Sequence, residues 1–252
     1  MARLTLDQIA PPLFVLIWAT GFIVARLVAP HADPLTFLST RYALVIAVLA
    51  AVAIIVRAPW PTTRRGWRDG LIAGVLLHGG YLGGVFWSVK HGLPAGIAAL
   101  IAGLQPLVTG ALVGPLLKEH VSPLRWTGIA VGFLGAALVV APKLGAVDGF
   151  PPLALAVCLF GTISITLGTI WQKRTAAKVD LRTNTVVQFM GALAVTLPVA
   201  LRLEDNKFDF APELLIGLAW AVFGLSMGAI GLLLVLIRRG AVAGVASLLY
   251  LV

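Results

Sequence analysis

The chain has 252 residues, of which 60% are hydrophobic and only 12% are charged. A soluble domain of this size carries about 25% charged residues, so the composition indicates a membrane protein. The net charge of +9 does not indicate a nucleic-acid-binding protein, because the basic residues fall in short segments between apolar stretches. The single cysteine, Cys158, excludes an internal disulfide and a cysteine-based metal site.

Apolar segments of membrane-spanning length recur along the whole chain. A helix that crosses about 30 Å of hydrocarbon needs roughly 20 residues. The predicted spans are 9–28, 35–56, 71–90, 94–117, 123–142, 151–172, 183–201 and 212–237, and a ninth begins near 241. Prolines at or beside several span starts are typical of the first turn of a helix; they are Pro34, Pro123, Pro152 and Pro212. The first apolar segment is too long for a cleaved signal peptide.

The basic residues are distributed unevenly between the two sides of these spans. With the N-terminus in the cytoplasm, 13 of the 19 basic residues lie on the cytoplasmic side and five on the other, while Arg41 falls inside a span. Because positive residues gather in cytoplasmic loops, this distribution predicts a cytoplasmic N-terminus.

Two segments of the chain resemble each other without a gap, at a spacing of 148 residues. They are VKHGLPAGIAALIAGL at 89–104 and IRRGAVAGVASLLYLV at 237–252. Weaker matches at about the same spacing pair Gly80 with Gly228, His78 with Ser226 and Arg41 with Gln188. A repeat of this length in an apolar chain is a recurring architecture of secondary transporters.

The repeated unit contains five predicted spans, which is an odd number, so its second copy is expected to lie inverted in the membrane. We expect one transmembrane domain over 1–252, with a first repeat of helices 1–5 at 1–145 and a second of helices 6–9 at 146–252. The fold class is then an all-α integral membrane protein of ten helices, with the tenth helix and part of the ninth absent from this chain.

Several short motifs follow one another along the chain: WATGF at 18–22, Arg41-Tyr42, GIAAL at 96–100, Gln105-Pro106, KEHVS at 118–122 and WQKR at 171–174. In their order and spacing these motifs resemble the drug/metabolite transporter superfamily, EamA type. Within that superfamily the chain is most similar to the YddG-type amino acid exporters. This resemblance implies two inverted five-helix repeats around a central cavity, and export of aromatic and other amino acids and of some toxic cations. The missing tenth helix departs from the pattern.

Four residues inside the spans are candidate substrate-binding residues. His78 lies near the middle of the third span and is expected either to bind substrate or a proton, or to be a neutral histidine bonded between helices. Tyr81, three residues later, is expected to share its face. Trp18 lies deep in the first span, where it lines a cavity or packs in the core. Arg41 is expected to hold a substrate carboxylate or to pair with carbonyls at the outer rim.

Further candidates lie in later spans. Ser164 in the sixth span and Tyr250 in the ninth complete the predicted substrate-binding residues, although a hydroxyl can instead bond a carbonyl of its own helix. Gln105 and Pro106 interrupt the fourth span. Pro106 is expected to free a carbonyl near Ala102 and to kink the helix, either as a hinge for gating or without any such role.

The positions of the acidic residues bear on the mechanism. All ten carboxylates fall in loops or at predicted helix ends, whereas proton-coupled antiporters commonly keep one within the membrane. The sequence therefore favours uncoupled or weakly coupled export of small amphipathic metabolites, amino acids in particular, by alternating access. A proton-coupled exporter of drugs or toxic organic cations is the alternative.

Other classes of function fit the sequence less well. An intramembrane enzyme is disfavoured because the chain has no HExxH, no GxSxG and no pair of intramembrane acids. A channel is disfavoured because rings of charged residues are absent. We expect no catalytic residue, metal or cofactor. The expected partners are an amino acid substrate and the lipid bilayer, without nucleic acid, for a monomer in a bacterial inner membrane.

Overall fold

The computed structural model describes residues 6–117, 123–143, 149–175, 179–228 and 232. Regular structure in these residues is helical, apart from an isolated bridge between Ala32 and Phe208. The helices in chain order are α1 (Leu6–Val28), α2 (Pro34–Ile55), α3 (Arg64–Gly74), η1 (Val75–Gly80), α4 (Tyr81–Lys90), α5 (Ala95–Ala102), α6 (Gln105–Leu117), α7 (Pro123–Val140), η2 (Ala141–Lys143), α8 (Pro152–Thr175), α9 (Leu181–Leu203), α10 (Pro212–Ala219) and η3 (Trp220–Gly228).

The helices lie where the sequence predicted spans, but not all of them have the length of a membrane span. Five helical segments are long and apolar enough to cross a membrane: Pro34–Ile55, Arg64–Lys90, Ala95–Leu112, Pro152–Thr175 and Leu181–Leu203. Shorter apolar helices cover Leu16–Val28, Trp126–Val139 and Pro212–Gly228. Helices begin at all four of the prolines noted above, where the missing N–H costs the helix nothing. The all-α fold is confirmed, while the expected ninth span lies outside the described residues.

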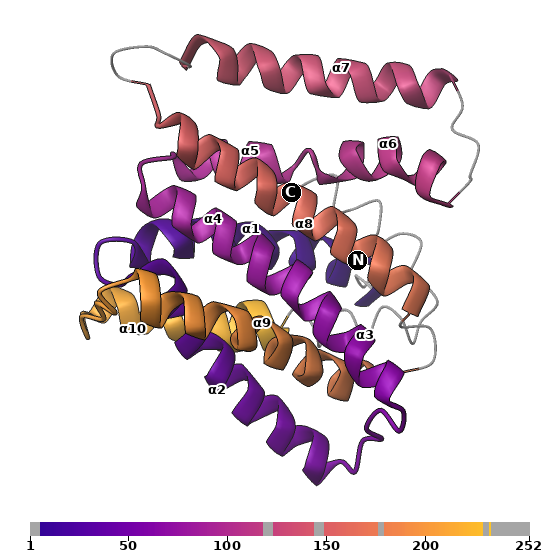
Figure 1. Cartoon of the computed structure of the whole chain (residues 1–252), viewed down its shortest axis with the longest axis vertical. Coiled ribbons are helices and arrows are strands. Elements are labelled where there is room, and N and C mark those ends of the chain that lie inside the picture. Colours follow the sequence, from indigo (N-terminus) through magenta and orange to yellow (C-terminus); the bar gives the residue numbers. More distant parts are fainter. Residues whose placement is uncertain (1–5, 118–122, 144–148, 176–178, 229–231, 233–252) are drawn as a thin grey trace, which may run out of the picture.

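The helices form a bundle in which described helices from the first and second halves of the chain pack against one another (Figure 1). α2 packs most extensively on α9, and α8 lies against α4 and η1. In Figure 1, α6 and α7 lie together at the opposite side of the bundle from α2. The largest fully buried side chains include Phe37, Leu38, Tyr42, Leu93 and Ile101. Helices from the early and late parts of the sequence therefore share one apolar core.

Glycines let α3 and α9 approach each other until their backbones touch. A Cβ atom added at Gly74 would overlap the Gln188 carbonyl, and one added at Gly191 would overlap the Leu71 carbonyl. Within a membrane, close packing of this kind replaces much of the hydrophobic drive for helix association. This contact fixes α3 and α9 relative to each other.

Two helix boundaries differ from the sequence-based expectations. The third span begins at Arg64 rather than at 71, because the Thr63 hydroxyl caps the helix by accepting the Gly66 N–H at 3.1 Å. The fourth span is broken at 103–104, before Pro106, which lies in the first turn of α6. The predicted kink is therefore a two-residue interruption of the helix at Gly103 and Leu104, and Pro106 lies in the first turn of the next helix rather than inside one.

The third and eighth spans each contain a π-helical stretch, η1 and η3, which the sequence did not indicate. π-helices carry i→i−5 bonds, are rare, and are often found at functional sites. η1 packs against α8 and α9, and η3 packs against α1 and α2.

Candidate functional site

Arg41 provides the first polar contact in the interior of the bundle. It lies seven residues after the start of α2 at Pro34, or about 10 Å along the helix. The side chain is 5% exposed, and its Nη2 donates a hydrogen bond to the Ser226 hydroxyl of η3 at 3.1 Å. Ser226 in turn donates to the Ala221 carbonyl at 3.0 Å, five residues earlier. The π-helical turn thus positions a hydroxyl toward the guanidinium.

His78 of η1 forms a second interior contact, with α9. Its ring stacks on Phe189 with centroids 4.4 Å apart, and its side chain and that of Gln188 lie within hydrogen-bonding reach. The Tyr42 hydroxyl donates to the His78 carbonyl at 2.9 Å. Tyr42 follows Arg41 in α2, so the two contacts are joined. We call Arg41, Tyr42, His78, Gln188, Phe189 and Ser226 the interior polar cluster.

The structure separates His78 from two other predicted site residues. Tyr81 is 4% exposed and lies on the side of α4 that faces α8, near Cys158, whereas His78 faces α9. The expectation that His78 and Tyr81 share one face assumed α-helical spacing, and the π-helical turn between them changes that spacing. The Ser164 hydroxyl donates to the Leu76 carbonyl at 2.9 Å, so it joins α8 to η1.

The remaining predicted site residues lie apart from the interior polar cluster. Trp18 is partly buried against the apolar core. Gln105 donates from Nε2 to the Thr169 hydroxyl at 3.2 Å, which joins α6 to α8 at the break before Pro106. Tyr250 lies outside the described residues. Ser226 and Gln188 were absent from the predicted site, although their match to His78 and Arg41 in the repeat was a signal that could have identified them.

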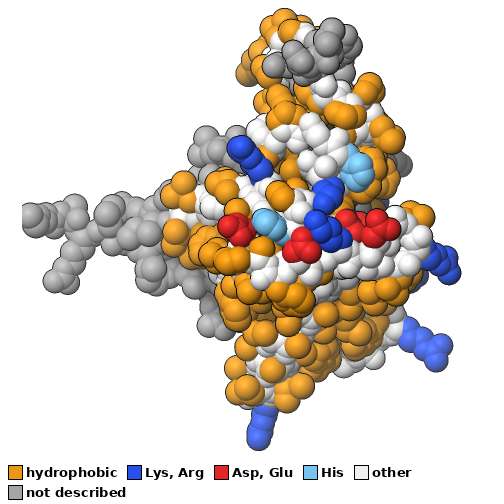
Figure 2. All heavy atoms as spheres, turned by 90° about the vertical axis from the view of Figure 1, so that its left-hand side faces the viewer, with side chains coloured by type: hydrophobic (Ala, Val, Ile, Leu, Met, Phe, Trp, Pro, Cys, Tyr) orange, Lys and Arg blue, Asp and Glu red, His pale blue; other side chains and the backbone are white. Residues whose placement is uncertain are grey.

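Charged side chains gather at the end of the bundle that carries Asp33, which we call the Asp33 end. Figure 2 shows this face, with acidic, basic and histidine side chains in a band between hydrophobic surfaces. Three connections between helices supply charged and histidine residues at this end: His31 and Asp33; Lys90 and His91; and Glu204, Asp205, Lys207 and Asp209. This end therefore combines segments that are far apart in the sequence.

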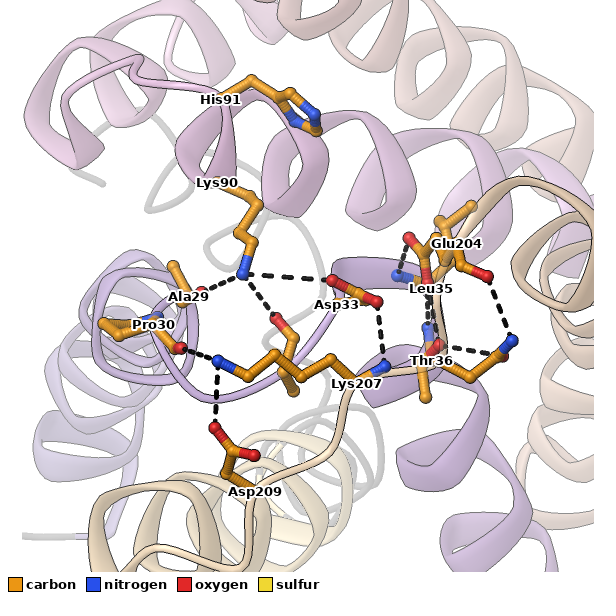
Figure 3. Close-up of polar contacts among 12 residues, drawn as sticks. Ala29, Pro30, Asp33, Leu35, Thr36, Lys90, His91, Glu204, Lys207 and Asp209 are labelled. Carbon is orange, nitrogen blue, oxygen red and sulfur yellow. Dashed lines mark hydrogen bonds and ion pairs between the residues drawn. The ribbon is translucent and has the colours of Figure 1, made fainter.

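Hydrogen bonds link these segments into what we call the latch: Asp33, Lys90, Glu204, Lys207 and Asp209 (Figure 3). The Glu204 carboxylate accepts the N–H groups of Leu35 and Thr36 at 2.9 and 2.8 Å, where the positive end of the α2 dipole favours a negative charge. The Lys207 N–H donates to the Asp33 carboxylate at 2.9 Å, and the Asp33 N–H donates to the Lys207 carbonyl.

The two lysines of the latch also bind backbone carbonyls. Lys90 Nζ donates to the carbonyls of Ala29 and Ala32, at 2.6 and 3.3 Å. Lys207 Nζ donates to the Pro30 carbonyl at 3.3 Å and lies 3.0 Å from the Asp209 carboxylate. The connection between α1 and α2 is thereby held both by the end of α4 and by the segment before α10.

At the opposite end, which we call the Asp69 end, ion pairs join close neighbours in the sequence. Asp69 pairs with Arg65 and Arg68, at 3.6 and 2.9 Å. Asp180 caps α9 and pairs with Arg182 at 2.7 Å. The hydrogen bond from Arg182 lowers the pKa of the Asp180 carboxyl below its ordinary value, and desolvation opposes this only in part.

Two neutral hydrogen bonds connect distant segments at the Asp69 end. The Trp171 Nε1 donates to the Asp69 carbonyl at 3.1 Å, and the Thr183 hydroxyl donates to the Pro59 carbonyl at 2.7 Å. An open depression of about 540 Å³ lies at this end, lined by Thr62, Thr63, Arg64, Trp67, Arg68, Leu71 and Ile72. None of the predicted substrate-binding residues lines it. No cluster of metal-ligating side chains occurs among the described residues.

The sequence of this bundle matches a known family. The model of the EamA-like transporter family aligns with residues 12–141, about half of the chain. The chain belongs to this family. It is therefore a multi-pass membrane protein of a transporter family.

Three curated relatives are similar over much of this chain. A "Probable amino-acid metabolite efflux pump" of Salmonella typhimurium is 26% identical, covering 64% of this chain and 52% of the relative. The "Uncharacterized transporter YvbV" of Bacillus subtilis is 24% identical, with coverage of 66% and 53%. "Protein PecM" of Dickeya dadantii is 26% identical, with coverage of 75% and 61%. The chain thus spans about half the length of the first two relatives.

The fold also resembles that of a solved crystal structure. The two chains superpose with a TM-score of 0.54 at 21% sequence identity, covering 96% of this chain and 93% of the other. At this identity the likeness supports the fold alone.

Proposed function

We propose that this EamA-like transporter exports small amphipathic metabolites, amino acids among them, by alternating access through the centre of the bundle. The observation that carries the proposal is the interior polar cluster, in which Arg41 and His78 meet hydroxyl and amide groups between helices far apart in sequence. Ionisable residues inside membrane spans commonly mark the path of a transported solute. Their position between α2, α9 and the two π-helices suits a site that rearranges when these helices move.

Amino acids are the favoured substrates because of the chemistry of the interior polar cluster and because of the similarity of this chain to a named relative. The cluster combines a cation and neutral hydrogen-bonding groups with aromatic rings, which suits a small molecule with a carboxylate and an apolar side chain. A relative named as an amino-acid metabolite efflux pump supports the same class. The resemblance to YddG-type exporters extends the proposed range to aromatic amino acids.

An inverted repeat is the proposed basis of the alternating motion. α8, α9 and α10 begin 146, 147 and 148 residues after α1, α2 and α3, close to the 148-residue spacing found in the sequence. This spacing pairs Arg41 with Gln188 and His78 with Ser226. The Arg41–Ser226 contact and the Gln188–His78 contact therefore occupy equivalent positions of the two proposed repeats. Gln188 lies seven residues into α9, as Arg41 does in α2. These correspondences support repeats at 1–145 and 146–252, in which one half rocks against the other.

The latch is the proposed outer gate. The basic residues of the sequence favour a cytoplasmic N-terminus, which puts the Asp33 end on the outer side of a bacterial inner membrane. The latch residues hold the connection between α1 and α2 to the segment before α10. Its bonds must break for a substrate to leave on that side.

Export is proposed to be uncoupled or weakly coupled to protons. The carboxylates whose side chains are described lie at the two ends of the bundle or on its surface, and none lies in the interior polar cluster. An acid within the membrane is the usual carrier of a coupled proton. Downhill release of substrate needs no such group.

Transport by purified protein in liposomes tests the proposal directly. Vesicles loaded with labelled leucine or phenylalanine are expected to release it saturably, with each amino acid competing against the other. An ionophore that collapses the proton gradient is expected to leave this downhill release largely unchanged. Failure to release any amino acid would overturn the proposed function, and abolition of release by the ionophore would overturn only the uncoupled mechanism.

His78 favours one alternative, a proton-coupled exporter of organic cations. Histidine is the side chain whose charge changes most readily near neutral pH, and here it lies inside a span. This alternative predicts that an imposed proton gradient drives release of methyl viologen, and that His78→Gln abolishes the drive. If the protein is an amino acid carrier, we expect both the unaltered protein and His78→Gln to release leucine without an imposed gradient.

A further inference from the structure

The guanidinium of Arg41 is a buried positive charge with an incomplete set of partners. Its side chain is 5% exposed, its Nη2 reaches only the neutral hydroxyl of Ser226, and its Nε has no hydrogen-bond partner. The Ser226 proton is already donated to the Ala221 carbonyl. The hydroxyl of the next residue, Tyr42, donates to His78. The neighbouring polar groups therefore hold the guanidinium in place without neutralising it.

No described carboxylate neutralises this charge. Those that pair with cations or cap helices do so at the two ends of the bundle, and they are Asp33, Asp69, Asp180, Glu204 and Asp209. Asp205 and Glu213 are exposed. The interior acid that would complete an ion pair with Arg41 is thus absent from the described side chains.

A charge held away from water is strongly unfavourable unless an opposite charge accompanies it. A guanidinium suits a carboxylate in particular, because its planar fork of N–H groups can donate two parallel hydrogen bonds to the two oxygens. The unpartnered Nε and the adjacent Nη2 lie on the same edge of that fork. They are the pair of donors that a carboxylate would occupy.

We infer that Arg41 binds the carboxylate of the transported metabolite, an inference that rests on the proposed function and names the group its substrate must carry. The rest of the ligand extends toward the neutral side of the interior polar cluster, where His78 stacks on Phe189. A ligand reaches the guanidinium when α2 and η3 move apart, because both enclose it in this structure. Organic cations without a carboxylate are disfavoured by repulsion from Arg41.

A purely structural role for Arg41, joining α2 to η3 through Ser226, makes a different prediction. In that case any loss of Arg41 lowers transport of every substrate to the same extent. A carboxylate-binding role instead changes the preference between a substrate that has a carboxylate and one that lacks it. The ratio of two transport rates therefore separates the two roles, even when the total rate also falls.

The first arm of the experiment uses the unaltered protein in liposomes. Release of L-phenylalanine is compared with release of L-phenylalaninamide, in which a neutral amide replaces the carboxylate. We expect the acid to be preferred by about tenfold or more, the range that a charge-assisted hydrogen bond supplies. Because this arm needs no substitution, it holds whether or not any variant folds.

The second arm compares Arg41→Gln with Arg41→Lys and with a matched control, Arg26→Gln, which removes an exposed arginine at the end of α1. Arg41→Gln is expected to remove the preference for the acid, Arg41→Lys to retain part of it, and Arg26→Gln to leave it unchanged. Thermal unfolding of each variant in detergent shows which of them are folded.

Each outcome either supports or overturns carboxylate binding by Arg41. A preference for the acid that disappears in Arg41→Gln supports it. Equal release of acid and amide by the unaltered protein, or an unchanged preference in folded Arg41→Gln, overturns it while the proposed export function stands. If Arg41→Gln does not fold, an undiminished preference in Arg41→Lys at reduced release of both compounds overturns it. Release of neither compound, nor of leucine, overturns the proposed function and the inference with it.

Discussion

The two ends of the bundle use their charges in different ways. At the Asp33 end, charged side chains bind groups far away in the sequence, such as Glu204 at the start of α2 and Lys90 at the carbonyls after α1. At the Asp69 end, the ion pairs join residues at most four positions apart, and neutral hydrogen bonds make the longer connections. The first arrangement restrains the separation of helices, whereas the second mainly stabilises each helix by itself.

This difference indicates which end opens more easily in the present arrangement. Separation of helices at the Asp33 end breaks charge-assisted hydrogen bonds, which are stronger than neutral ones. Separation at the Asp69 end leaves most ion pairs intact. Between the two ends, the backbones of α3 and α9 touch at Gly74 and Gly191, and this contact is the fixed point about which we propose that the two ends move.

The largest effect is expected from Gly74→Ala at this fixed point. The new methyl group would overlap the Gln188 carbonyl, so α3 and α9 must separate and the protein loses about 3 kcal/mol or more of folding free energy. Thermal unfolding in detergent measures the loss. Gly96→Ala is the matched control, because a Cβ there meets nothing within 4 Å. Equal stability of the two variants would show that the contact is not fixed.

Opening of the Asp33 end is measurable through Cys158, the sole cysteine. It is fully buried six residues after the start of α8 at Pro152, on the side of the bundle that the latch closes. Combining Glu204→Gln with Lys90→Met is expected to raise the rate of maleimide labelling of Cys158 about fivefold or more, because local opening becomes more frequent.

The control for this labelling experiment is a substitution at the other end. Asp180→Asn removes an ion pair at the Asp69 end and is expected to leave Cys158 as protected as before. Equal acceleration by both sets of substitutions would indicate general loosening and would remove the distinction between the ends.

A smaller effect is expected from Glu204→Gln alone. The amide keeps the size of the side chain but loses the negative charge at the start of α2, so the protein loses about 1 kcal/mol of stability. Asp205→Asn changes the neighbouring exposed carboxylate and is expected to change stability by less than about 0.5 kcal/mol. Identical melting temperatures for the two variants would contradict the capping role of Glu204.

The smallest effect is expected at Asp180. Because Arg182 lowers the pKa of this carboxyl in the folded protein, its stabilising contribution is present above the ordinary aspartate pKa of about 4. The contribution is lost as the pH falls through the lower folded pKa. Melting temperatures measured from pH 7 downward should therefore fall more steeply for the unaltered protein than for Asp180→Asn. Parallel curves would show that the pair does not contribute.

The spans could be predicted because hydropathy and length decide them, and proline chemistry decided where α2, α7, α8 and α10 begin. The π-helices η1 and η3 could not be predicted from the sequence, since a π-helical turn depends on how the helix packs rather than on local propensity. They also explain why Tyr81 does not lie with His78. The interior positions of Arg41 and His78 could be predicted because an ionisable residue within an apolar span is conspicuous. The role of Glu204 at the start of α2 could not be predicted, because its hydrogen-bond partners lie 168 and 169 residues away in the sequence.

The position of Glu204 has a consequence for biosynthesis. Glu204 is 168 residues downstream of Thr36, whose N–H it accepts. At 5–20 residues per second, a ribosome makes α2 roughly 10 to 30 s before this carboxylate exists. During that interval the first turn of α2 must rely on water or on lipid headgroups at the membrane surface. Its final cap arrives only after α9 has been inserted, so the closing of this end belongs to the last stages of assembly.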